Sequence, residues 1–118
     1  MLKIAVLIFA IGALGGLILA SSVLRGRLAP WALSIVHMLL GATGLVLVAL
    51  TVLGGGTEAE KGIITIALLF LLVAALEGFY LASLHVKKQV ASVGIVATHA
   101  SFAVIGFLLL VGGTFHLL

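Results

Sequence analysis

The stretch "LASSVLRGRLAPWALSIVHMLLGATG", residues 19–44, joins two long apolar segments through a connection that holds two arginines and the only proline. The apolar segments extend outward from it over residues 4–23 and 31–53, and two more follow at 63–84 and 90–117. Each reaches the roughly 20 residues that an α-helix needs to cross the hydrocarbon core of a bilayer. The sequence therefore predicts an all-α integral membrane protein with four transmembrane helices.

The composition excludes an ordinary soluble domain. Hydrophobic residues make up 64% of the 118 residues and charged residues only 8%, whereas soluble domains carry about 25% charged residues. The absence of cysteine excludes disulfides and thiolate metal sites. No P-loop, dinucleotide fingerprint or catalytic constellation is visible, and the few basic residues form no patch of the kind that nucleic acid requires.

The charged residues predict an orientation in the membrane. The basic residues of the first and third connections are Arg25, Arg27, Lys87 and Lys88. In the second connection, Lys61 is offset by Glu58 and Glu60. The positive-inside rule then places connections 24–30 and 85–90 in the cytoplasm and both termini outside. We expect the membrane to be a bacterial inner membrane, with the termini in the periplasm. Lys3 argues weakly against this orientation.

An internal repeat relates the two halves of the chain. A shift of 62 residues places "GGLILASSVLRGRLA" (15–29) on "EGFYLASLHVKKQVA" (77–91), His37 on His99 and Gly44 on Gly106. We interpret this as a duplication within a single transmembrane domain, 1–118, with repeats at 1–56 and 63–118. Two helical hairpins that run in the same direction predict an antiparallel four-helix bundle with a pseudo-two-fold axis along the membrane normal. The alternative is two unrelated generic hairpins.

The repeat places His37 and His99 at the same depth, about 10 Å inside the cytoplasmic boundary at a helical rise of 1.5 Å per residue. A neutral histidine in a membrane helix usually faces the interior of the bundle. Small residues follow the same faces, or stand at this depth on the other two segments: Gly16, Gly41, Gly44, Gly78, Ala103 and Gly106. They predict either a slot for a flat ligand or close helix packing.

The paired histidines and their small neighbours resemble four-helix transmembrane b-type cytochromes, in architecture only, because no specific family signature is matched. The resemblance implies one haem b with His37 and His99 as axial ligands and the six small residues lining it. It implies one-electron transfer rather than catalysis in its own right, a membrane redox partner or quinone-linked complex, and quinone as a second candidate ligand. Familiar di-haem members have two histidine pairs, whereas this chain offers one. A homo-oligomer also fits these features.

Glu77 is the only acidic residue inside a predicted span. We weigh four roles for its carboxyl group: a hydrogen bond to the outer nitrogen of a ligating histidine, proton transfer, a metal site with His37 and His99, and a protonated group bonded to a backbone carbonyl.

Other polar residues have weaker assignments. Arg25, Arg27 and Lys87 are candidates for the propionate side of the haem. We expect His85 to be a solvated loop residue, and His116 lacks a symmetric partner that would support it as a ligand. The competing functions are a non-redox accessory subunit that packs through its small-residue stripes, and proton or metal handling by His37, His99 and Glu77.

Overall fold

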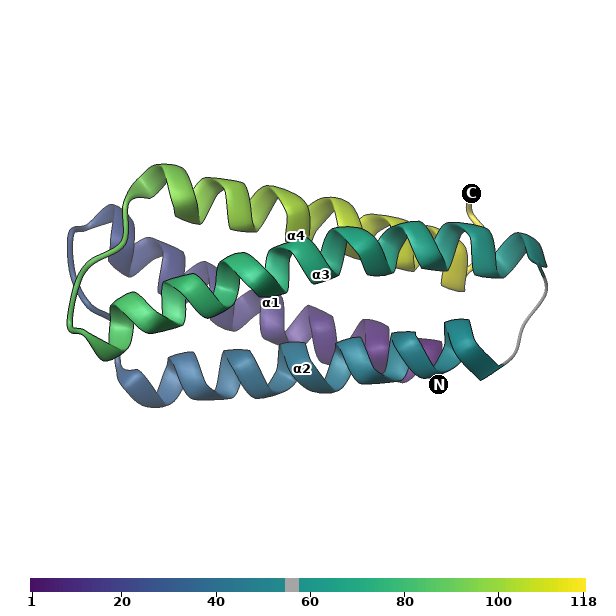
Figure 1. Ribbon diagram of the computed structural model, residues 1–118, viewed down its shortest axis with the longest axis horizontal. Coiled ribbons are helices and arrows are strands. Elements are labelled where there is room, and N and C mark those ends of the chain that lie inside the picture. The colour runs from purple at the N-terminus through teal and green to yellow at the C-terminus, as the bar shows by residue number, and fades with distance from the viewer. Residues whose placement is uncertain (55–57) are drawn as a thin grey trace.

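The computed structural model describes residues 1–54 and 58–118. This part of the chain folds into four α-helices: α1 (Leu2–Leu24), α2 (Trp31–Gly54), α3 (Glu58–Val86) and α4 (Val93–Thr114). Together they form a bundle of 45 × 22 × 19 Å (Figure 1). All four helices are long and apolar enough to span a membrane. The predicted all-helical class with four membrane-length helices is therefore confirmed.

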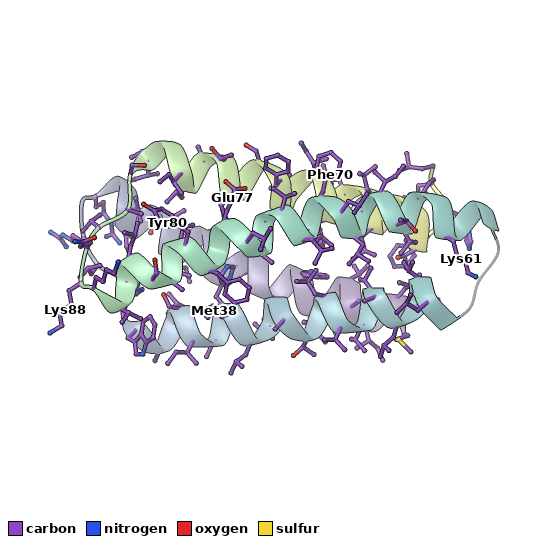
Figure 2. The ribbon with its side chains drawn as sticks, in the orientation of Figure 1. Met38, Lys61, Phe70, Glu77, Tyr80 and Lys88 are labelled. Atoms are coloured by element: carbon purple, nitrogen blue, oxygen red, sulfur yellow. The ribbon has the colours of Figure 1, made fainter. Side chains whose placement is uncertain are left out.

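The bundle consists of two helical hairpins that lie side by side. Helix α1 packs mainly against α2 and α3 mainly against α4, while the hairpins meet through α2 with α3 and α1 with α4. The two short connections, 25–30 and 87–92, lie at one end of the bundle, and both termini lie toward the other (Figure 1). We call the former the short-connection end. Lys88 lies at this end and Lys61 at the opposite one (Figure 2).

The helix ends differ from the predicted segments because hydropathy marks the apolar stretch and not the last hydrogen-bonded turn. Helix α3 begins at Glu58, inside the predicted connection, since polar residues with good helix propensity extend it. Helix α4 begins at Val93 because the Ser92 hydroxyl caps it by accepting the Ile95 N–H at 3.3 Å. Gly54 is the last residue of α2, one residue beyond the apolar segment 31–53, whereas Gly55 and Gly56 lie outside the described residues.

Most large apolar side chains lie on the outside of the bundle. Leu17, for example, is 68% exposed, and Leu7 and Leu14 are similar. The buried apolar residues are Ala5, Val48, Ile64, Ala67, Leu71, Ala74 and Leu110. These lie at or beyond the level of His37 and His99, away from the short connections. On the short-connection side of the two histidines, the buried residues among those described are Ser22 and Ser34. The apolar core therefore fills one half of the bundle.

The helix contacts inside the two hairpins follow the 62-residue repeat. A Cβ atom added at Gly44 in α2 would lie 2.6 Å from Phe9 of α1. At the equivalent Gly106 in α4, it would lie 2.8 Å from Leu71 of α3. A large side chain of the first helix thus rests on a glycine of the second in each hairpin. These equivalent contacts support the internal duplication that the sequence predicts.

Candidate functional site

His37 of α2 and His99 of α4 come together inside the bundle. Their ring centroids lie 6.2 Å apart with an angle of 76° between the ring planes. The two helices that carry them are diagonal in the bundle, because within the described residues the packed pairs are the four lateral ones. The rings therefore meet across the bundle, as the predicted depth of the two histidines requires.

Each histidine ring is anchored by the helix that precedes its own. The Nδ1 atom of His37 lies 2.8 Å from the Gly12 carbonyl oxygen, and that of His99 lies 2.7 Å from the Ala74 carbonyl oxygen. A carbonyl oxygen only accepts, so Nδ1–H donates in both rings. A neutral imidazole with its proton on Nδ1 leaves Nε2 as a lone-pair nitrogen. Metal-binding histidines are commonly oriented by such a bond to a backbone carbonyl.

Two glycines make room for the imidazole rings. A Cβ atom at Gly16 would lie 3.0 Å from His37 Cε1, and one at Gly78 would lie 3.2 Å from His99 Cε1. Both distances are tighter than ordinary van der Waals contact. Gly16 and Gly78, which the sequence placed at the depth of the histidines, therefore rest against the rings themselves, one on each.

The other four small residues have different surroundings. Gly44 and Gly106 are buried beneath Phe9 and Leu71, so the described side chains already fill the space beside them. Gly41, one turn beyond His37, has no atom within 4 Å of an added Cβ and so borders open space. Ala103, one turn beyond His99, is half-buried. The predicted haem-lining role is thus compatible with space at Gly41, whereas Gly44 and Gly106 serve helix packing.

Glu77 lies near this pair without bonding to it. Its side chain leaves α3 on the side of α4 (Figure 2), and it interacts electrostatically with His99. Its Oε1 atom is buried and has no hydrogen-bond partner among the described residues. The Ala74 carbonyl, and not Glu77, holds the outer nitrogen of His99. Within the described residues, no three His, Cys, Asp or Glu side chains are close enough to hold a metal ion, so the predicted His37, His99 and Glu77 site is not formed.

The remaining candidates lie away from the histidine pair. Arg25, Arg27 and Lys87 are exposed at the short-connection end, where the Arg25 Nε–H donates to the Ser21 carbonyl at 3.2 Å. His116 follows α4 in a left-handed conformation with φ 55°.

The prediction that His85 is a solvated loop residue is wrong. His85 belongs to the last turn of α3. Its Nδ1 lies 2.6 Å from the Ser34 hydroxyl, and its Nε2 lies 2.9 Å from the Ala29 carbonyl oxygen. Because that carbonyl only accepts, Nε2–H donates to it; in the tautomer with its only ring proton on Nε2, Nδ1 accepts the Ser34 O–H. The Trp31 ring packs edge-on at 5.0 Å.

The polar residues "KKQ" (87–89) beside His85 suggested a loop at this point, although the repeat indicated a helix. His85 aligns with Val23, an apolar residue in the last turn of α1. A residue that replaces valine in an equivalent helix is more readily placed inside that helix than beyond its end.

Comparison of the chain with models of protein families, with curated proteins and with solved structures found no match. The geometry of the histidine pair is therefore the basis for the functional assignment.

Proposed function

We propose that the chain is a membrane b-type cytochrome, in which His37 and His99 bind one haem that passes single electrons. The four helices form an antiparallel bundle in the membrane, with the short-connection end in the cytoplasm and both termini outside. Exposed leucines over the outer surface support insertion, because lipid is the solvent that would cover them favourably. The bundle length of 45 Å matches a bilayer of roughly 40–45 Å with its headgroups.

The distance between the two imidazole rings is the observation that carries the proposal. Two imidazoles that bind one ion from opposite sides, through bonds of about 2 Å, have ring centroids roughly 6 Å apart. The centroids of His37 and His99 are separated by 6.2 Å. Both rings also hold Nδ1–H against a carbonyl, so Nε2 is the nitrogen left for ligation.

The surroundings of the pair fit a large flat ligand. Gly16 and Gly78 form a cradle that a Cβ atom would fill. Between the histidines and the short connections, the described helices bury two serines and no large apolar side chain. A macrocycle in the bundle would supply the apolar contacts that this half lacks.

The chain's own residues have distinct roles in this proposal. When bound, haem would supply a one-electron couple, and ligation by both His37 and His99 would favour electron transfer over oxygen binding. The Gly12 and Ala74 carbonyls fix the tautomer and orientation of the two ligands. The Glu77 carboxyl group lies near His99 and interacts electrostatically with its ring.

The proposal is tested by the absorbance of the protein purified in detergent from haem-replete cells. We expect a Soret band, sharp α and β bands on reduction, and about one haem per chain. His116→Ala is the matched control and should keep this spectrum, since His116 follows the end of α4. A colourless preparation, or loss of the haem in the His116 variant, contradicts the proposal.

A non-redox accessory subunit is the second candidate, and the edge-to-face contact of the rings favours it. This contact is itself favourable at 6.2 Å, so the pair can stabilise the bundle with no ligand bound. In that case the exposed apolar faces would serve a partner protein or a second copy of the chain. A colourless protein that co-purifies as a stable assembly would support this candidate.

A further inference from the structure

A second site lies at the short-connection end, away from the histidine pair. A pocket of about 470 Å³ opens there between the two hairpins. It is lined by Leu28, Ala29, Trp31, His85, Val86 and Lys88. The walls come from the first and third connections, the start of α2 and the end of α3. The pocket therefore exists only where the two repeats meet.

The backbone at Lys88 shows that a lysine occupies a position that favours glycine. Gly26 follows the C-terminal end of α1 with φ 66°, and its repeat equivalent Lys88 follows the end of α3 with φ 57°. Both ends have the same Schellman pattern of hydrogen bonds: Gly26 N–H to Val23 O and Arg27 N–H to Ser22 O, then Lys88 N–H to His85 O and Gln89 N–H to Leu84 O. Glycine adopts this left-handed conformation readily, whereas other L-residues do so at a cost. A residue kept in a disfavoured conformation points to a use for its side chain.

The residues that form the wall of the pocket also differ from their equivalents in the repeat. His85, Trp31 and Ser34 correspond to Val23, Val93 and Val96 in the other half. The equivalent corner of the bundle is thus built from valines, so the fold does not require the polar set. Because both ring nitrogens of His85 are bonded to Ser34 and Ala29, His85 holds the wall in place and does not face a ligand as a free donor.

The charge and polarity of the pocket define the ligand class. Lys88 lines the pocket, and Arg25, Arg27 and Lys87 stand at the same end, while neither short connection contains an acidic residue. The other walls are apolar and open to the outside, with Val86 66% and Leu28 41% exposed. A ligand that fits both features has an anionic group joined to a hydrocarbon part.

We propose that this pocket binds an anionic phospholipid, with the Lys88 ammonium on the headgroup phosphate and the acyl chain along Leu28 and Val86. Trp31, which is 43% exposed, supplies the amphipathic ring that membrane interfaces favour. Basic pockets between membrane helices on the cytoplasmic side are suited to such headgroups. The inference rests on the membrane insertion and orientation proposed above, and it does not depend on haem.

The test compares phosphatidylglycerol with phosphatidylcholine on the purified protein in detergent. Native mass spectrometry counts retained lipid, and thermal unfolding measures the shift in Tm. We expect at least fivefold preference for phosphatidylglycerol, lost in Lys88→Gln and kept in Lys88→Arg. Lys61→Gln, the same change at the opposite end, should keep the preference. Without lipid, Lys88→Gly should have a Tm at least as high as that of the wild type, because glycine readily adopts the backbone conformation there. It should lose the lipid-dependent shift in Tm, because it has no ammonium group.

Three results would overturn the inference: equal retention of both lipids by the wild type, an equal loss in the Lys61 and Lys88 variants, or a full Tm shift with inorganic phosphate alone. The last would make the occupant a soluble anion. A colourless protein that still selects phosphatidylglycerol contradicts the cytochrome and leaves the lipid site standing. A haem protein without lipid selectivity contradicts the lipid site and leaves the cytochrome standing.

Discussion

The imidazole rings of His37 and His99 meet across the bundle with their centroids 6.2 Å apart, and the Nδ1–H of each ring donates to a backbone carbonyl of the preceding helix. The first hairpin contributes His37 with Gly12 and Gly16. Each of these has a counterpart 62 residues later in the second hairpin. Each hairpin therefore supplies half of the histidine pair, and pairing two such halves gives the two imidazole ligands that the proposed haem would need.

The glycines against the rings predict a site-specific effect. Gly16→Ala and Gly78→Ala should each displace a histidine ring, because the new Cβ would lie 3.0 or 3.2 Å from Cε1. We expect a cost of about 1–3 kcal/mol, as for other overpacked interiors, and weaker haem retention. Gly62→Ala, outside the proposed site, is the control, since no atom lies within 4 Å of its added Cβ. Haem titration of the three variants measures the difference, and equal affinities would argue against the cradle.

Substitution of the glycines beneath Phe9 and Leu71 should lower the stability of the fold without changing the ligation of the haem. Gly44→Ala brings a Cβ to 2.6 Å from the Phe9 ring, and Gly106→Ala brings one to 2.8 Å from Leu71 and 3.2 Å from the Ala67 carbonyl oxygen. Both should lower Tm, with Gly106→Ala the more severe because a backbone atom cannot move aside. The reduced spectrum should stay unchanged. A shifted spectrum with normal Tm would instead favour the haem-lining role that the sequence predicts for these glycines.

Glu77 predicts an electrostatic effect on the redox potential. If its carboxylate is charged beside His99, it favours the oxidised, more positive form of the site. Glu77→Gln should then raise the midpoint potential by roughly tens of mV, given about 59 mV for each tenfold change in a one-electron equilibrium. Redox titration at neutral pH measures it. An unchanged potential would contradict an electrostatic role of Glu77 at the histidine pair.

The hydrogen bond between His85 and Ser34 predicts that substitutions at these two residues have non-additive effects on stability. His85→Val removes both bonds and leaves the buried Ser34 hydroxyl without its partner, which should cost about 1–3 kcal/mol. The double variant Ser34→Val/His85→Val should cost less, because the repeat places Val96 of α4 and Val23 of α1 at the equivalent positions. Unfolding of the single and double variants checks this. Additive losses would contradict the idea that the polar corner is dispensable to the fold.

Much of the fold was predictable because hydropathy and the repeat are properties of the chain itself. The four helices, the shared depth of the two histidines and the placement of Gly16 and Gly78 follow from segment length and the 62-residue shift. The helix ends were less predictable. Glu58 and His85 are polar, so hydropathy assigns them to connections although backbone hydrogen bonding continues through them.

Contacts between hairpins could not be predicted from the sequence. Ser34 and His85 are 51 residues apart, and their repeat equivalents are the valines Val96 and Val23, so neither periodicity nor symmetry predicts a hydrogen bond between them. The same limit applies to the Gly12 and Ala74 carbonyls. Any residue type supplies a backbone carbonyl, and only the packing of α1 on α2 and α3 on α4 brings these two to the histidines.

The most direct test of the account is the electron paramagnetic resonance spectrum of the oxidised protein. We predict a low-spin ferric signal in the wild type that is lost in His37→Ala and in His99→Ala alike, because each ring fills one axial position. A low-spin signal that survives either substitution would show that the haem is held elsewhere. That result would contradict the opposed histidine pair as its site.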